Sequence, residues 1–311
     1  MTRHGLHHVT AFSGPVRRNL DFYTRVLGLR LVKKTVNFDD PGTYHLYYGD
    51  ADGTPGSILT FFPIEQAAPG RAGIGETQET GFRVPRAAIG WWAHRFTETG
   101  VAFEPPVHVF GDTVLRFRDP DGMMLALVGT DDTGTEAAGA PWDGGIPAEH
   151  AIRGFHGVTL LLKEAAPTAA ILTDVLGFAE TGREGSLIRL SSGAATGGVV
   201  TLRAVGGFLP GRPGAGSVHH IAFRAADDAE QEAMAERLRS VHGLAVTEQR
   251  DRNYFRSVYF REPGGVLFEI ATDSPGFAVD EPAESLGTAL KLPAFLEPHR
   301  GQIEQVLPKV A

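Results

Sequence analysis

Short apolar stretches alternate with amphipathic ones along the chain, and the same order recurs four times. The clearest amphipathic stretch covers residues 19–28, where apolar side chains stand at helical spacing and Gly28 marks the end of a helix. A short apolar strand precedes it, and three strands follow, the last of them after a turn. The pattern predicts four units of order β-α-β-β-β, near residues 5–66, 77–130, 153–205 and 216–273.

Internal repeats relate these units. Residues 6–10 (LHHVT) match residues 155–159 (FHGVT), and residues 117–122 (FRDPDG) match residues 260–265 (FREPGG). We therefore expect an α+β fold of four βαβββ modules in two tandem halves. The expected boundaries are an N-terminal domain at 1–135, a C-terminal domain at 150–275 and a tail at 276–311, with a linker at 131–150 rich in Asp, Gly, Thr, Ala and Pro.

Composition narrows the classes of function. The 311 residues carry a formal net charge of -8, which argues against a nucleic-acid partner because phosphates need a basic surface. The chain has no cysteine, so disulfides and thiolate-bound metals are excluded. The N-terminus lacks the apolar core of a signal peptide, and no apolar run reaches the roughly 20 residues of a membrane helix. These features predict a soluble cytoplasmic protein.

Polar residues stand at equivalent strand positions of the modules. Two imidazoles and one carboxylate come from modules 1 and 4 together, and such a set suits an Fe(II) ion that keeps positions open for oxygen and substrate. Modules 2 and 3 supply no comparable set. Adjacent side chains of a strand face opposite ways, so one histidine of each pair is expected to bind metal, and the repeats do not choose between them. In module order, the first strands carry His7-His8, Glu79, His156-Gly157 and His219-His220, and the last strands carry Thr60, Ala126, Thr201 and Glu269.

The module order, with a histidine on the first strand and a glutamate on the last, resembles the vicinal oxygen chelate superfamily. This superfamily includes glyoxalase I and the extradiol catechol dioxygenases. Five segments narrow the resemblance to the hydroquinone-type ring-cleaving dioxygenases, and the resemblance covers essentially the whole chain. These segments are residues 7–10 (HHVT), 37–41 (NFDDP), 44–49 (YHLYYG), 219–222 (HHIA) and 296–300 (LEPHR).

The resemblance implies that each half of the chain forms a curved mixed sheet around a central cavity. It selects the second histidine of each pair as a ligand, so that the metal is bound by His8, His220 and Glu269. Fe(II) is the implied cofactor, and Mn(II) would satisfy the same ligands. The implied partners are a small aromatic substrate and O2, which an extradiol-type route would use to open the ring. The implied residues of the chemistry are Tyr259 as hydrogen-bond donor, Arg252 as the cation that orients the substrate, and His7, His219 and Thr10 beside the ligands.

Other functions compete with this hypothesis of a hydroquinone dioxygenase. A glyoxalase-like isomerase or lyase would need a fourth ligand where Thr60 stands. A catechol extradiol dioxygenase stays open, because ring substituents are read by loops whose shape the sequence does not give. A metal-free binding protein would have no need of the triad. His156 is expected to be structural, His45 is left open between lining the pocket and packing, and a homo-oligomer is neither required nor excluded.

Overall fold

The computed structural model describes residues 4–131 and 140–310, so residues 132–139 of the expected linker lie outside the described residues. Four successive modules of order βαβββ are present, as the sequence pattern predicts. Module 1 contains β1 (Leu6–Ser13), α1 (Val16–Asp21) with a following π-helical turn (Phe22–Val26), β2 (Arg30–Asn37), β3 (Asp40–Gly49) and β4 (Ile58–Pro63). Module 2 contains β5 (Glu76–Pro85), a 3-10 turn (Arg86–Ala88), α2 (Ile89–Thr99), β6 (Val107–Val109), β7 (Asp112–Arg118) and β8 (Met124–Thr130).

The second half of the chain repeats this order and ends in a tail. Module 3 contains β9 (Phe155–Leu162), α3 (Ala166–Asp174), β10 (Ala179–Glu184), β11 (Leu187–Ser191) and β12 (Val199–Ala204). Module 4 contains β13 (Val218–Ala225), α4 (Asp228–Ser240), β14 (Arg250–Asp251), β15 (Phe255–Arg261) and β16 (Leu267–Pro275). The tail contains short 3-10 turns (Phe277–Val279, Ala283–Ser285 and Glu297–His299) and α5 (Arg300–Val306).

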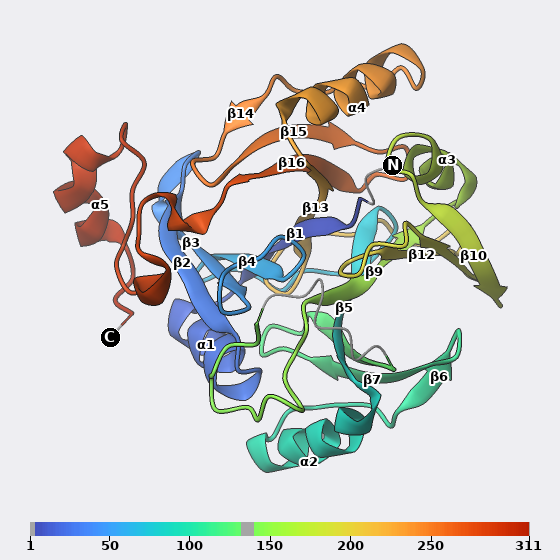
Figure 1. Ribbon diagram of the computed structural model, residues 1–311, viewed down its shortest axis with the longest axis horizontal. Helices are drawn as coiled ribbons and strands as arrows, with labels where there is room; N and C mark the ends of the chain where they lie inside the picture. Colours follow the sequence, from blue (N-terminus) through green and yellow to red (C-terminus); the bar gives the residue numbers. More distant parts are fainter. Residues whose placement is uncertain (1–3, 132–139, 311) are drawn as a thin grey trace.

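Two eight-stranded mixed sheets carry the fold (Figure 1), and the expected α+β class with its curved sheets is confirmed. The first sheet has the order β14-β15-β16-β13-β1-β4-β3-β2, and the second has the order β10-β11-β12-β9-β5-β8-β7-β6. The expectation that each half of the chain builds its own sheet is wrong, because module 1 pairs with module 4 and module 2 with module 3. The modules of each sheet are joined through their first strands: β1 pairs with β13, and β5 pairs with β9, both antiparallel. The domain boundaries at 1–135, 150–275 and 276–311 stay a prediction.

The register of the first sheet places its polar positions in one row. Strand β13 lies between β1 and β16, antiparallel to the former and parallel to the latter. Thr10 pairs with His220, and Ala222 pairs with Glu269. Because side chains alternate along a strand, residues two apart face the same side of the sheet. The register therefore brings the first strands of modules 1 and 4 and the last strand of module 4 together at one point.

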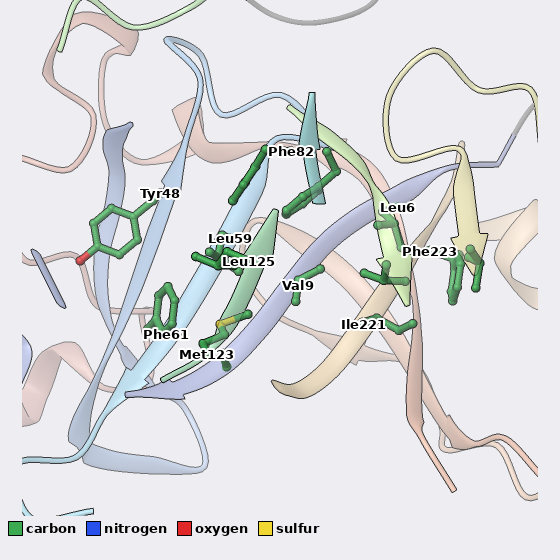
Figure 2. Packing of buried hydrophobic residues seen from close by; sticks show 14 of the residues in the cluster. Leu6, Val9, Tyr48, Leu59, Phe61, Phe82, Met123, Leu125, Ile221 and Phe223 are labelled. Atoms are coloured by element: carbon green, nitrogen blue, oxygen red, sulfur yellow. The ribbon is translucent and has the colours of Figure 1, made fainter. Parts of the chain in front are cut away.

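The main hydrophobic core lies between the two sheets, and Figure 2 shows part of it. Val9 and Phe61 of the first sheet belong to the same cluster as Phe82 and Leu125 of the second. All four side chains are fully buried, which makes this contact the main hydrophobic stabilisation of the fold. The polar row of the first sheet faces away from this core.

The repeated turns after β7 and β15 each contain a buried acidic side chain that is hydrogen-bonded to a helical residue. Tyr23 donates its hydroxyl proton to Asp119 at 2.9 Å, and Thr168 donates to Glu262 at 2.6 Å. Each acid also accepts backbone N–H groups of its own turn, including those of Met123 and Val266. Within residues 4–131 and 140–310, none of the helices is both long enough and apolar enough to span a membrane.

Candidate metal centre

Three buried side chains converge on the concave side of the first sheet. His8 comes from β1, His220 from β13 and Glu269 from β16, three strands that are neighbours in the sheet. The two Nε2 atoms lie 3.2 Å apart. Glu269 Oε2 lies 3.4 Å from His8 Nε2 and 2.9 Å from His220 Nε2. In the described part of the chain, no other group of at least three His, Cys, Asp or Glu side chains is gathered this closely.

These separations fit a bound divalent metal. Metal–ligand bonds of about 2.1 Å would place ligand atoms about 3.0 Å apart at right angles and about 3.4 Å apart at tetrahedral angles. Glu269 Oε2 is buried and has no partner in hydrogen-bonding geometry among the described residues, although His220 Nε2 is close to it. An acceptor buried without a donor is costly, and a cation at this point would remove that cost. The three side chains therefore fit a metal, with one negative charge among them.

The electrostatics of Glu269 favour the ionised carboxylate. Burial alone would raise the pKa of Glu269, but the His8 and His220 imidazoles hold it well below its usual range. Its second oxygen, Oε1, accepts a hydrogen bond from Ser257 Oγ at 2.5 Å. Ser257 thus fixes the carboxylate with Oε2 toward the histidines. Sequence reasoning missed this residue, although Ser257 stands two positions before Tyr259 on the same strand and so shares its face.

Each candidate ligand histidine is contacted by the histidine that precedes it. His7 Nδ1 lies 2.9 Å from His8 Nδ1, and His219 Nδ1 lies 2.7 Å from His220 Nδ1. Both Nε2 atoms face the triad, so each Nδ1 is left to exchange a hydrogen bond with its neighbour. Burial first, and then the charge of His8, lower the pKa of His7 well below its usual value. A neutral His7 can accept a proton donated by His8 Nδ1, which would fix the tautomer that a metal ligand needs.

The position equivalent to Glu269 in module 1 is closed to a metal. It holds Thr60, which is fully buried and donates a hydrogen bond to Thr10 Oγ1 at 2.9 Å. His45 Nε2 lies 2.7 Å from Thr60 Oγ1, and the Tyr47 hydroxyl lies 2.9 Å from His45 Nδ1. Burial, followed by the charges of nearby histidines, lowers the pKa of His45 well below its usual range. The hydroxyl of Thr60 is therefore used within the protein.

Beside the triad lies a cavity of about 70 Å3. Its lining settles the open question about His45, which faces this cavity with Tyr47. Three aromatic side chains, Phe38, Phe62 and Phe255, supply apolar walls on which a flat ring can pack. The full lining is His8, Asn37, Phe38, His45, Tyr47, Phe62, His219, His220, Arg252, Phe255, Tyr259 and Glu269.

Arg252 and Tyr259 lie together on the wall of this cavity. Arg252 Nε donates to the Tyr259 hydroxyl at 3.2 Å, and Arg252 Nη2 lies 3.0 Å from Asp39 Oδ2. Because Arg252 donates to the Tyr259 oxygen, the tyrosine proton is free to point elsewhere. Burial, and then the charge of Glu269, raise the pKa of Tyr259, so this hydroxyl stays protonated. The ion pair of Arg252 with Asp39 joins module 4 to module 1, and no pattern in the sequence indicated it.

The expected site residues all lie on the triad's sheet or beside its cavity, but they differ in whether they line that cavity. His219, Arg252 and Tyr259 line the cavity. His7 and Thr10 do not line it: His7 contacts the lining residue His8, and Thr10 accepts a hydrogen bond from Thr60. His156 lies on β9 of the second sheet, whereas the triad lies on the first, and it lines a different cavity.

Comparison with known proteins agrees with this fold. Residues 5–127 and 154–270 match the model of the Glyoxalase/Bleomycin resistance protein/Dioxygenase superfamily. MhqO of Bacillus subtilis (strain 168), named as a candidate ring-cleaving dioxygenase, is 46% identical over 304 residues, which cover 97% of this chain and 95% of MhqO. The chlorohydroquinone/hydroquinone 1,2-dioxygenase of Sphingobium indicum is 35% identical over 305 residues, which cover 94% of this chain and 92% of that protein.

A crystal structure of a candidate dioxygenase from Bacillus subtilis superposes with a TM-score of 0.93 at 45% identity, covering 99% of this chain and 98% of that one. The chain belongs to the Glyoxalase/Bleomycin resistance protein/Dioxygenase superfamily, and within it to the family that contains these relatives. The family resemblance expected from the sequence segments is confirmed.

Proposed function

We propose that this protein is a ring-cleaving dioxygenase that opens hydroquinones with both atoms of O2, using Fe(II) bound by His8, His220 and Glu269. The observation that carries the proposal is the convergence of two imidazoles and one carboxylate beside a cavity with aromatic walls. A three-ligand set leaves coordination positions for substrate and dioxygen. Hydroquinone cleavage by the Sphingobium relative, as its name states, supports the choice of substrate class.

The reaction balances without an external reductant. One carbon–carbon bond beside a hydroxylated carbon breaks, its two carbons each take one oxygen atom of O2, and the ring supplies all four electrons. When bound, Fe(II) would supply the one-electron chemistry that lets a closed-shell phenol react with triplet O2. The protein's own part is to hold the ring, to place its hydroxyl groups and to supply protons.

Orientation is the main task, because a hydroquinone has its hydroxyl groups at opposite ends of the ring. Only one of them can reach the triad, and the other must be bound by protein groups. Phe62 and Phe255 would hold the ring by its faces. Arg252 and Tyr259 present donors from a neighbouring wall, and Tyr259 keeps its proton for a developing negative charge. Tyr259 is therefore assigned as donor and Arg252 as the orienting cation.

Oxygen uptake by anaerobically prepared protein loaded with Fe(II) tests the proposal. Hydroquinone, methylhydroquinone and catechol are the substrates, and the matched variants are His8→Ala, which removes a ligand, and His156→Ala, which removes a histidine of the second sheet. We expect iron-dependent uptake with one ring-opened product per O2, lost in His8→Ala and kept in His156→Ala.

Two other results would overturn parts of the proposal. Faster turnover of catechol than of either hydroquinone would assign the catechol extradiol activity instead. Stoichiometric iron binding without oxygen uptake on any phenol would reject the dioxygenase and favour a glyoxalase-like reaction at the same triad.

A further inference from the structure

The second sheet encloses a cavity of its own, of about 550 Å3, much larger than the cavity beside the triad. It is lined by β5, β7 and β8 from module 2 and by β9, β11 and β12 from module 3. These strands belong to the second sheet, part of which is labelled in the right and lower part of Figure 1. Volumes of about 300 to 1,000 Å3 are typical of cavities that bind small organic molecules. Nothing in the proposed dioxygenase reaction uses this cavity.

An ion pair stands here where the first sheet has its candidate metal ligands. Gly81 pairs with Ala126 as Ala222 pairs with Glu269, which makes Glu79 the counterpart of His220. Arg116 pairs with Ala126 as Tyr259 pairs with Glu269, so Arg116 is the counterpart of Tyr259. Arg116 Nε donates to Glu79 Oε2 at 2.5 Å.

The position equivalent to His8 in the second sheet has no room for a histidine side chain. Gly157 is the counterpart of His8, and a Cβ atom on Gly157 would lie 2.0 Å from the backbone oxygen of Val199. Gly157 stands at the position of His8 and Ala126 at the position of Glu269, so neither position offers a metal ligand. Among the described residues, the second sheet therefore has no counterpart of the triad, and an ion pair occupies one of the three positions.

Two guanidinium groups in this cavity have unused donors. Arg116 uses only Nε, and its two Nη groups have no hydrogen-bond partner among residues 4–131 and 140–310. Arg189 uses Nη1 for Asp112, and its Nη2 likewise has no partner among those residues. Both side chains are less than one-third exposed, so these donors are only partly hydrated. A ligand with acceptor oxygens would satisfy them.

Arg189 is held firmly for such a role. Its guanidinium carbon lies 4.3 Å from the centre of the Phe110 ring. Phe110 has a φ of 50°, in the left-handed region that bulky residues rarely adopt, in the Phe110-Gly111 turn of the β6–β7 hairpin. Asn or Gly is the usual choice at such a turn, so the phenylalanine costs stability locally. Its contact with Arg189 offsets that cost and fixes the guanidinium at the cavity wall.

We propose that the second cavity binds a small organic carboxylate with an apolar body. The unused Nη donors of Arg116 and Arg189 match the planar oxygens of a carboxylate. The apolar body is matched by valine, leucine and methionine side chains that line the same cavity: Val114, Met124, Val128, Val158, Leu187 and Val199.

Charge distinguishes a carboxylate from other ligands. Glu79 and Asp112 each neutralise one arginine, and Glu104, Glu184 and Arg203 are exposed at the edge of the cavity, where solvent screens them. A dianion such as phosphate would meet no net positive charge and an apolar floor. A neutral arene would displace water from the guanidinium donors without offering them hydrogen-bond acceptors. A monocarboxylate brings one negative charge instead of two, offers acceptor oxygens to the guanidinium donors and places its apolar body against the apolar lining.

Titration of the full-length protein with benzoate, followed by calorimetry and by amide NMR shifts, tests the proposal. Benzyl alcohol serves as the neutral isostere and inorganic phosphate as the simple anion. We expect benzoate to bind with shifts in β7, β8 and β11, and at least 10-fold tighter than either control. Arg116→Met and Arg189→Met are each expected to weaken binding about 10-fold, while His220→Ala leaves it within 2-fold.

Glu79→Gln controls for loss of binding caused by poor folding, because it is expected to strengthen binding. It keeps the side-chain volume and removes the competing charge on Arg116, so it is expected to tighten benzoate binding several-fold. Equal binding of benzyl alcohol, absence of benzoate binding at millimolar concentration, or loss of binding in His220→Ala instead of Arg116→Met would each overturn the proposal. None of these outcomes bears on the dioxygenase reaction, which oxygen uptake tests separately.

Discussion

His45 Nε2 lies 2.7 Å from the hydroxyl of Thr60, the residue that the internal repeat makes the counterpart of Glu269. Thr60 in turn donates to Thr10 on the strand that carries His8. The fourth ligand position of a glyoxalase-like site is thus filled by a short hydroxyl group that already has two partners. The residue at this position distinguishes a glyoxalase-like site from the proposed dioxygenase. A carboxylate here would take up a coordination position that dioxygen or substrate needs.

Thr60→Glu is therefore expected to keep the bound metal while lowering ring-cleaving turnover by at least 100-fold. Metal content and oxygen uptake, measured on the same preparation, check this. Thr60→Val is the matched control: it removes the hydrogen bonds at a cost of about 1 to 2 kcal/mol of stability but adds no ligand, so turnover should fall far less. Equal losses in both variants would contradict the ligand argument.

Tyr259→Phe removes one hydroxyl and leaves the ring in place. Arg252 would lose its acceptor, and the substrate would lose a donor aimed at developing negative charge. We expect kcat to fall by about 100-fold with a small change in KM and with the metal content unchanged. A change confined to KM would instead assign Tyr259 to substrate binding alone.

The triad should couple metal binding to folding. Because a metal bound only by the native state stabilises it by mass action, saturating Mn(II) at 100 times its Kd should add about 2.7 kcal/mol to the unfolding free energy. The matched variants are His220→Ala, which should abolish the Mn(II)-dependent rise in Tm, and His156→Ala, which should keep it. A rise that survives in His220→Ala would place the metal elsewhere.

Much of this site could be predicted from the sequence because the repeats carry positional information. His8 and His220 stand at the same position on the first strands of modules 1 and 4, and Glu269 stands on the last strand of module 4, which pairs with the first strand. The choice between His7 and His8 needed the family resemblance, since both align equally well. Ser257 and Asp39, which contact site residues, have no equivalent repeat position that would have pointed to them.

The pairing of modules shows where sequence reasoning stops. Repeats relate the modules to one another but do not say which edges join, and the sheet is closed by β1 with β13 rather than by modules adjacent in the chain. Asp39 is a second example: its residue type suits a turn, and only the approach of Arg252 from module 4 gives it a partner. Contacts between distant modules are set by packing, which local sequence does not encode.

Asp119 predicts a pH-dependent stability that one substitution should remove. Burial raises its pKa to about 6, despite hydrogen bonds from its turn and from Tyr23 that favour the ionised form. A carboxyl group whose pKa is raised by folding contributes stability that is full below its unfolded pKa, near 4, and is lost as pH rises through 6. Two pKa units correspond to about 3 kcal/mol.

Asp119→Asn mimics the neutral acid and can still accept from the backbone while its amide group donates to Tyr23. Its unfolding free energy, measured in urea, should therefore rise relative to the unsubstituted protein by about 2 to 3 kcal/mol between pH 4 and pH 8. Tyr23→Phe is the companion variant: loss of the donor should raise the pKa of Asp119 further and move the loss of stability to higher pH. Parallel curves for Asp119→Asn and the unsubstituted protein across this range would show that Asp119 is ionised in the native state at acidic pH.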